Sequence, residues 1–306
     1  MTQHKNKRSG TRPVLLLVAG LAGLGTTILM LLAGVDVRLL NPKGVIADQQ
    51  LWLMLFSFFL IMTIAVPTLF VLYSFAWKYR ESNTNAPYDP VSRTGKFSVA
   101  TMWVLPTIFM ILLALVMWPA TQRLEPKKTI AADGKPPLTV QVVAMRWKWL
   151  FIYPEQNIAT VNYVHIPVDR SIQFELTADE VSMSSFWVPH LGGQLYAMTG
   201  HVNTLNLVAS EPGQYPGSTA EINGAGFAGM KFTVQASSTE DFNRWVQDMK
   251  TSSDMLDASE YNKLLKPSEN HPKVLYSAAD PGLYSKLLMK YTGSQKHKIE
   301  HHEAGH

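Results

Sequence analysis

The chain of 306 residues contains no cysteine and little charge. Without a thiol it can form no disulfide, no zinc–thiolate site and no catalytic thiol. Charged residues make up 16% of the sequence, whereas ordinary soluble domains have about a quarter. The first 120 residues are strongly apolar and the rest is mixed. This division predicts membrane segments followed by one soluble domain that is large enough to have its own core.

Motifs of self-contained enzymes are also absent. The sequence has no phosphate-binding loop, no His-Glu-x-x-His pair and no recognisable pairing of a nucleophile with a base. The net charge is +4, but the basic residues gather beside the apolar segments, which is typical of membrane topology signals and not of a nucleic-acid surface. We therefore expect no active site made by this chain alone.

Three long apolar runs occupy the N-terminal part. Residues 14–34 carry no charge and follow a basic N-terminus, which fits either a signal peptide or a first transmembrane helix. The runs Leu51–Trp77 and Phe97–Ala120 are long enough to cross a bilayer. The short loop between these two runs carries four basic residues, namely Lys78, Arg80, Arg93 and Lys96. The positive-inside rule then places this loop in the cytoplasm and everything after Ala120 outside it.

The C-terminal part has the period-two pattern of half-buried strands, separated by glycine and proline turns. The clearest runs are Leu138–Val143, Ser171–Thr177 and Thr204–Val208. Such short strands predict a Greek-key sandwich. Helical spacing follows at Asp241–Lys250, Ser259–Lys266 and Pro281–Tyr291. Thr239 suits the N-cap of the first of these helices.

The stretch 218–232 reads S-T-A-E-I-N-G-A-G-F-A-G-M-K-F. It resembles the copper loop of subunit II of the haem–copper respiratory oxidases, roughly C-x-E-x-C-G-x-x-H-x-x-M. Three residues match this pattern, namely Glu221, Gly224 and Met230. Three ligand positions differ, because Thr219 and Asn223 replace the cysteines and Phe227 replaces the histidine. The frame of the loop is present, but the soft ligands that such a copper site needs are not.

Two further segments resemble the same family. Val188-Pro189-His190-Leu191-Gly192 matches its Val-Pro-x-Leu-Gly tail, and the histidine ligand that precedes this tail aligns with Ser184. Trp147-x-Trp149, in an aromatic stretch after the first strand, is a third match. Because both halves of the copper site have lost their ligands, the chain resembles subunit II of the bo-type ubiquinol oxidases, the quinol-oxidising branch without the dinuclear copper centre.

This resemblance implies a membrane α-helical hairpin, preceded by a signal or signal-anchor segment and followed by an all-β cupredoxin-like Greek-key sandwich with a helical C-terminal extension. A lipid anchor is not supported, because Val35 stands where lipoprotein relatives have cysteine. The expected parts are the segment 1–34, the two-helix domain 35–120, the linker 121–136, the periplasmic sandwich 137–236, the extension 237–291 and a mobile, histidine-rich tail 292–306.

The function implied is that of subunit II of a proton-pumping terminal quinol oxidase, which oxidises ubiquinol and reduces oxygen to water in the bacterial inner membrane. The chain would have a structural and assembly role beside subunit I and would bind no cofactor, with the haems and copper in subunit I. Further partners would be subunits III and IV, membrane lipid and, through the complex, ubiquinol. Trp147 and Trp149 would face subunit I or pack under the sandwich.

Two other functions compete with this interpretation. One is a copper-binding subunit II of a cytochrome c oxidase, which the absence of cysteine disfavours. The other is a membrane-tethered periplasmic binding or assembly protein. The three histidines inside the β-region, His165, His190 and His201, fall at no ligand position and are expected to be surface or hydrogen-bonded residues.

Overall fold

The computed structural model describes residues 37–85, 95–130, 134–181, 183–251 and 254–291, together with Gly20, Gly23 and Gly25. The chain divides into two compact units, residues 1–41 and 42–306. Apart from three glycines, the expected signal or anchor segment 1–34 lies outside the described residues, and so does the tail 292–306. The proposed boundaries between the parts of the chain stay a prediction.

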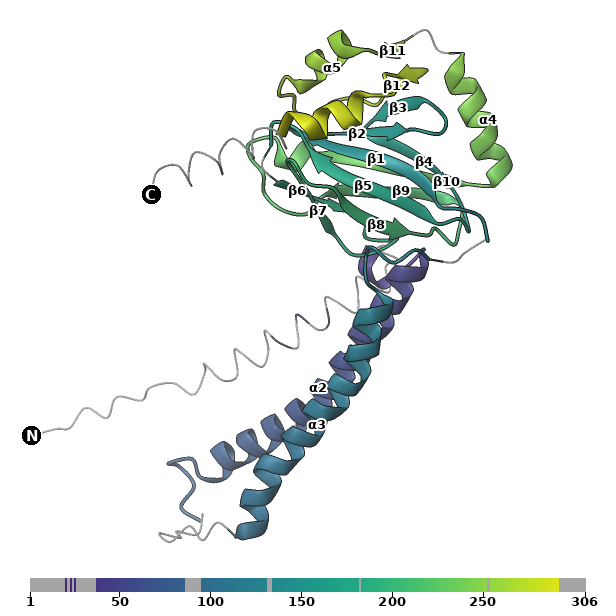
Figure 1. Cartoon of the computed structure of the whole chain (residues 1–306). Coiled ribbons are helices and arrows are strands. Elements are labelled where there is room, and N and C mark those ends of the chain that lie inside the picture. Colours follow the sequence, from purple (N-terminus) through teal and green to yellow (C-terminus); the bar gives the residue numbers. More distant parts are fainter. Residues whose placement is uncertain are drawn as a thin grey trace, which may run out of the picture. The chain divides into compact units, whose positions relative to one another are not determined.

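Two long helices make the membrane hairpin. A 3₁₀ turn, η1 (Arg38–Leu40), precedes α2 (Val45–Lys78), and α3 (Lys96–Arg123) runs back beside it (Figure 1). Both helices are long and apolar enough to cross a membrane, and their apolar windows are not buried inside this chain. Such a pair must cover its side chains with lipid or with another protein. The two apolar runs predicted from the sequence as membrane segments are both helical, and each helix is a few residues longer than the run.

The soluble part is a sandwich of a six-stranded and a five-stranded sheet (Figure 1). The order of the six strands is β12-β3-β2-β1-β5-β8, and that of the five is β4-β10-β9-β6-β7. Two pairs, β1 with β5 and β4 with β10, are parallel, while the other pairs within these sheets are antiparallel. The strands of the first sheet are β1 (Leu138–Met145), β2 (Lys148–Tyr153), β3 (Ile158–Val161), β5 (Ile172–Ala178), β8 (Asn203–Leu207) and β12 (Val274–Tyr276). Those of the second are β4 (Tyr163–Pro167), β6 (Met183–Trp187), β7 (Leu195–Met198), β9 (Gly213–Thr219) and β10 (Lys231–Ser237).

Strand β2 is buried on both faces. Trp149, Phe151 and Tyr153 point into the core between the two sheets. Leu150 and Ile152 alternate with them and belong to a second core on the outer face of the six-stranded sheet. A strand covered on both sides has no polar face, which explains why the sequence reads as an unbroken aromatic and aliphatic run here.

The C-terminal extension supplies the cover of this outer face. It contains α5 (Ala258–Leu265), a helix over residues 283–291 and a small parallel sheet of β11 (Met255–Leu256) with β13 (Ala278–Ala279). Apolar side chains of these elements form the second core with β2 and β3, among them Tyr261, Leu264, Leu283 and Leu287. The extension begins with α4 (Thr239–Lys250), so all three helices expected from the sequence are present.

Two local expectations need correction. The N-cap of α4 is Ser238 and not Thr239, because the Ser238 hydroxyl accepts the Asp241 N–H three residues later at 3.1 Å and Thr239 is already helical. The strand β9 was missed, since it contains Pro216 and Gly217, residue types that weaken a strand pattern. Gly217 is needed there, because a Cβ atom would lie 2.2 Å from the ring of Phe232.

Backbone hydrogen bonds connect the N-terminal end of α2 to the sandwich. The Lys43 N–H donates to the His190 carbonyl at 2.8 Å, and the Ala47 N–H donates to the Leu191 carbonyl at 3.2 Å. The first turn of a helix has N–H groups without partners inside the helix, and here the Val-Pro-x-Leu-Gly segment provides a partner for one of them. Gly44 also pairs with Ala209 as an isolated bridge. The motif that marks the family thus joins the soluble domain to the membrane hairpin.

We expect Gly44→Ala to loosen this junction. A Cβ atom at Gly44 would lie 2.6 Å from the Val208 carbonyl oxygen and 2.9 Å from the Leu191 Cα. Overpacking against backbone costs about 1–3 kcal/mol, so the substitution should lower the unfolding temperature of the full chain in detergent.

Gly95→Ala is the matched control, because Gly95 is also a helix N-cap and has no atom within 4 Å of the added Cβ. The weaker capping by alanine applies to both sites. Equal shifts for the two variants would contradict the packing role of Gly44.

Candidate functional site

The segment that resembles a copper loop connects β9 to β10 and contains the 3₁₀ turn η2 (Phe227–Gly229). The fold brings this segment to β6, which carries Ser184. The Asn223 side-chain amide donates to the Ser184 hydroxyl at 2.9 Å and approaches the Met230 sulfur at 3.1 Å. The sequence therefore identified side chains that are far apart in the chain and adjacent in the fold.

The remaining positions complete the same small cluster. The Thr219 hydroxyl lies 3.4 Å from the Glu221 carbonyl oxygen, and Met230 is fully buried. Phe227 begins η2 and offers a half-buried ring in place of an imidazole. These are two hydroxyls, an amide, a thioether and a ring, which do not match the thiolate and imidazole ligands of a copper electron-transfer site. Within the described ranges no three His, Asp or Glu side chains form a possible metal site either.

The ring of Trp147 packs against the glycines of this loop. Its backbone is in the left-handed region, with a φ of 65°, which is uncommon for a large side chain. Its ring lies over two loop glycines: a Cβ atom would be 3.2 Å from the ring at Gly224 and 2.3 Å at Gly226. The glycines are therefore needed because the indole occupies the space of their missing side chains.

The two tryptophans have different environments, so that the two alternatives stated for the pair apply to them differently. Trp149 is fully buried and packs edge-to-face on Phe186 and Phe232, with ring centroids 5.4 and 5.8 Å away. Such a side chain is part of the core and does not reach a partner subunit. Trp147 is half-buried, so that an interface role stays a hypothesis for Trp147 alone.

A cavity of about 460 Å³ opens beside this loop. Arg146, Trp147, Met183 and Ile222 line it, together with the carboxylates of Glu180 and Glu221. Ile222 is 84% exposed, although isoleucine is a residue that folding normally buries. The rim therefore combines exposed apolar side chains with charges of both signs, as the edge of a protein interface does.

Comparison with known proteins identifies the relatives of this fold. Residues 153–237 match the family described as the cytochrome c oxidase subunit II periplasmic domain, and residues 250–295 match the COX aromatic rich motif. The cytochrome bo(3) ubiquinol oxidase subunit 2 of Pseudomonas putida is 42% identical over 90% of this chain and 88% of its own length.

The chain belongs to the ubiquinol oxidase subunit 2 family. The ubiquinol oxidase subunit 2 of Acetobacter aceti is also 42% identical, over 90% of this chain and 88% of its own length. Among solved structures, the periplasmic domain of subunit II of the cytochrome oxidase of Bradyrhizobium japonicum is 22% identical, with a TM-score of 0.36, and covers 40% of this chain and 96% of that one. Membership confirms the predicted family and its fold class, a membrane-anchored hairpin with a cupredoxin-like sandwich.

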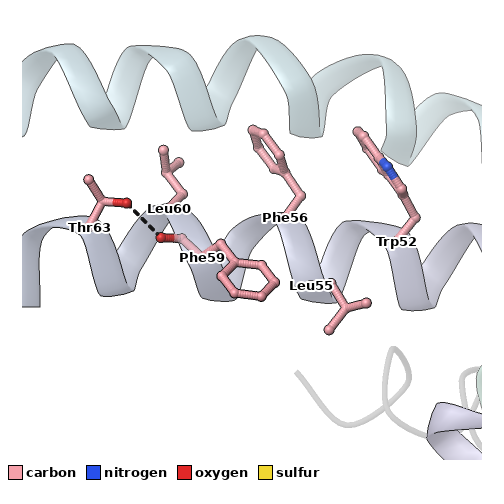
Figure 2. Close-up of a pocket in the computed structure, with 6 residues that line it drawn as sticks. All are labelled: Trp52, Leu55, Phe56, Phe59, Leu60 and Thr63. Atoms are coloured by element: carbon pink, nitrogen blue, oxygen red, sulfur yellow. Dashed lines mark hydrogen bonds between the residues drawn. The ribbon is translucent and has the colours of Figure 1, made fainter. Parts of the chain in front are cut away.

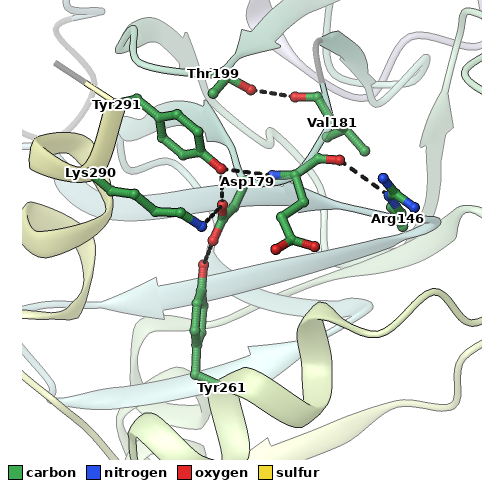
Figure 3. Close-up of polar contacts among 8 residues, drawn as sticks. Arg146, Asp179, Val181, Thr199, Tyr261, Lys290 and Tyr291 are labelled. Carbon is green, nitrogen blue, oxygen red and sulfur yellow. Dashed lines mark hydrogen bonds and ion pairs between the residues drawn. The ribbon is translucent and has the colours of Figure 1, made fainter. Parts of the chain in front are cut away.

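The aromatic rich motif of this family member is attached to the sandwich by a buried carboxylate. Asp179, at the end of β5, accepts hydrogen bonds from the Tyr261 hydroxyl at 2.6 Å, the Lys290 ammonium at 2.9 Å and the Tyr291 hydroxyl (Figure 3). Only 1% of Asp179 is exposed. A buried carboxylate needs such donors, so the charge fixes α5 and the last helix together.

A buried cation holds the same motif at a second point. The Lys148 ammonium donates to the Leu264 and Lys266 carbonyls, each at 2.8 Å. These carbonyls are at the C-terminal end of α5, where a positive charge is favoured by the helix dipole. Burial lowers the pKa of Lys148. Asp179 belongs to no recognisable motif and Lys148 occupies the variable position of Trp147-x-Trp149, so spacing alone could not have revealed their roles.

The three histidines of the sandwich do not converge on the loop. His165 is buried, and its Nε2 lies 2.8 Å from the Ser237 hydroxyl. Burial, together with the nearby charge of Lys273, lowers the pKa of His165 to about 4, which the charge of Asp241 partly opposes. His190 is also buried and contacts the Tyr215 ring, whereas His201 is exposed. His165 is thus hydrogen-bonded and His201 is a surface residue, as the sequence predicts for each.

We expect Asp179→Asn to release the last helix. The asparagine amide keeps one acceptor oxygen but loses the charge that attracts Lys290. The resulting loss of stability is at most the cost of removing one partner from a buried ion pair, which is about 3–5 kcal/mol. Hydrogen exchange of residues 283–291 in the full chain should accelerate.

The control is Asp280→Asn, three residues before the same helix begins. Asp280 also pairs with a lysine, Lys286, at 2.6 Å, but Lys286 is exposed and Asp280 is only partly buried, and pairs near the surface contribute little. Asparagine also preserves the bond from the Gly282 N–H. If both variants change exchange equally, the buried position of Asp179 is not what matters.

We expect the stability of the soluble domain to fall as pH drops from about 6.5 to 4. The unfolded chain protonates His165 near its ordinary pKa of 6.5, and the folded chain only near pH 4. The stability due to neutral His165 is thus fully present above pH 6.5 and lost progressively toward pH 4, by at most about 3 kcal/mol.

Thermal unfolding of the full chain across this range measures the effect. The variant His165→Gln should have a weaker pH dependence, whereas His201→Gln should behave like the unmodified chain. A His165→Gln profile parallel to the wild type would assign the acid sensitivity to carboxylates.

Proposed function

We propose that the chain is subunit II of a proton-pumping terminal quinol oxidase, a complex that oxidises ubiquinol and reduces oxygen to water in aerobic respiration. The observation that carries this proposal is the set of side chains at the former ligand positions. The Asn223 side-chain amide donates to the Ser184 hydroxyl and approaches the Met230 sulfur, and these side chains present no thiolate or imidazole to a metal. The relatives, which are ubiquinol oxidase subunits 2, support the choice of substrate.

The chemistry of the electron donor explains why a copper centre is dispensable. Cytochrome c is water-soluble and delivers electrons at the membrane surface, so a relay in the soluble domain is useful. Ubiquinol is a lipid and delivers its electrons from within the bilayer. In our proposal the haems and the remaining copper belong to subunit I, and this chain has no active site and binds no cofactor of its own. Ser184, Thr219, Glu221, Asn223, Phe227 and Met230 then mark a former copper site.

The role left to this chain is to brace and cover subunit I. The rim formed by Trp147, Met183 and Ile222 is a suitable contact surface, because exposed apolar side chains surround a charged cavity. The two membrane helices offer a second surface, since their apolar side chains are not covered by this chain. Subunits III and IV complete the complex that we propose.

The proposed location is the bacterial inner membrane, with several crossings. Lys78, Arg80 and Lys96 flank the connection between α2 and α3, and by the positive-inside rule they support a cytoplasmic location for it. The sandwich and its extension then lie in the periplasm. We retain the segment 1–34, the linker 121–136 and the tail 292–306 as separate parts of the chain in this proposal.

The test is to purify the complex through a tag on this chain and to measure haem yield and ubiquinol turnover per haem. Haem should co-elute with the chain in mild detergent. Trp147→Phe should leave turnover per haem near normal, because no electron passes through the ring. Trp147→Ala should lower the yield of assembled complex, since the loop loses the ring that covers Gly224 and Gly226.

Trp149→Ala serves as the reference for loss of core packing, which costs about 3–5 kcal/mol for a buried aromatic. It should lower yield further than Trp147→Ala. If Trp147→Phe assembles normally but loses most of its turnover per haem, Trp147 is part of an electron route and the structural role proposed for the chain is wrong.

A further inference from the structure

A cavity lies between the start of α2 and the end of α3, and both charged and apolar side chains line it. Asp48 and Gln49 from α2 and Arg123 from α3 line this cavity of about 520 Å³, together with apolar side chains such as Leu115 and Val116. Leu115 is eight positions before Arg123, which at 1.5 Å per residue is about 12 Å along the helix. The lining thus changes from charged to apolar along the helix axis.

The position of the charges corresponds to the head-group layer of a bilayer. The apolar run of α2 begins at Leu51, and that of α3 ends at Ala120. Asp48 and Arg123 lie one turn beyond these limits. Trp52 stands next to them, where aromatic side chains mark the membrane interface. The apolar part of the cavity is therefore at the depth of acyl chains.

A second cavity continues toward the membrane interior. It has about 390 Å³ and shares Trp52 with the first. Phe56, Leu60 and Thr63 line it farther along α2 and, like Trp52, point toward the neighbouring helix (Figure 2). The rings of Trp52 and Phe56 are stacked 5.5 Å apart. From Trp52 to Thr63 the helix rises about 17 Å, which is about half of the 30 Å hydrocarbon core and thus the depth of one leaflet.

The two charges are available to a ligand. Asp48 and Arg123 are exposed, and within the described part of the chain neither side chain makes an ion pair or hydrogen bond. A guanidinium binds a phosphodiester through paired hydrogen bonds. A carboxylate accepts hydrogen bonds from an ammonium group. An anionic and a cationic side chain at one cavity complement a ligand that itself carries both charges.

We propose that this groove binds one phospholipid of the outer leaflet whose head group carries a primary amine. Arg123 contacts its phosphodiester, Asp48 contacts its ammonium, and one acyl chain lies along α2 from Trp52 to Thr63. This proposal rests on the membrane crossing and orientation proposed above. A ligand with a phosphate but no amine would use Arg123 alone, so the contribution of Asp48 distinguishes the two lipid classes.

The experiment uses the complex purified through this chain, delipidated in detergent and mixed with equal amounts of dioleoyl-phosphatidylethanolamine and dioleoyl-phosphatidylglycerol. Native mass spectrometry counts the retained lipids. The wild type should retain one more phosphatidylethanolamine than the double variant Asp48→Asn/Arg123→Gln. Arg123→Gln should reduce retention of both lipids about tenfold, whereas Asp48→Asn should retain a lipid without preferring the amine head group.

The control is Lys128→Gln/Glu155→Gln, which removes the same two charges from exposed positions that do not line the cavity. It should retain the lipid. Equal retention by the wild type and the cavity variant overturns the proposal. A wild-type preference for phosphatidylglycerol also overturns it, as does a complex that holds no lipid because another subunit fills the groove.

Haem co-elution separates this inference from the proposed function. If haem co-elutes and the lipid counts do not differ, the lipid site is wrong and the oxidase role stands. If no haem co-elutes, the oxidase role fails, and the same lipid count on the full chain in nanodiscs of the two lipids still decides whether the site exists.

Discussion

Burial of strand β2 on both faces is the constraint on which the soluble domain depends. One face carries Trp149, Phe151 and Tyr153 into the core between the sheets, and the other is covered by the C-terminal extension. Without the extension, an apolar face in the middle of the six-stranded sheet would meet water. The aromatic rich motif is therefore part of the fold and not an appendage, and its tyrosines supply both apolar area and hydroxyl donors.

Two buried charges give this second core a defined position. Hydrophobic contact is not directional, so apolar side chains alone would let the extension slide on the sheet. Lys148 reaches the end of α5, and Asp179 collects donors from α5 and from the last helix. Each charge is costly to bury, and each finds partners only when the extension sits in one place. The pair thus specifies position more than it adds stability.

The loop that resembles a copper site keeps its shape here through hydrogen bonds and ring packing. In a copper site, metal–ligand bonds connect the loop to the neighbouring strand. In this chain the Asn223 amide makes that connection through Ser184 and Met230, and the Trp147 ring covers the loop glycines. Neutral hydrogen bonds and ring packing are weaker than metal coordination, but they suffice because the strands on either side are fixed by the core. The contact surface that we propose beside the loop therefore needs no metal to keep its shape.

The sequence by itself determined the membrane hairpin, the sandwich and the former copper positions. Long charge-free runs allow few structures, and a ligand pattern with fixed spacing can be read even after its ligands have changed. Only the tertiary structure decided that Trp149 belongs to the core while Trp147 covers the loop, because both have the same residue type and the same surroundings in sequence. The hidden roles of Asp179 and Lys148 depend on partners between 82 and 118 residues away. No local pattern contains such pairs, since they arise only when the C-terminal extension folds back onto β2.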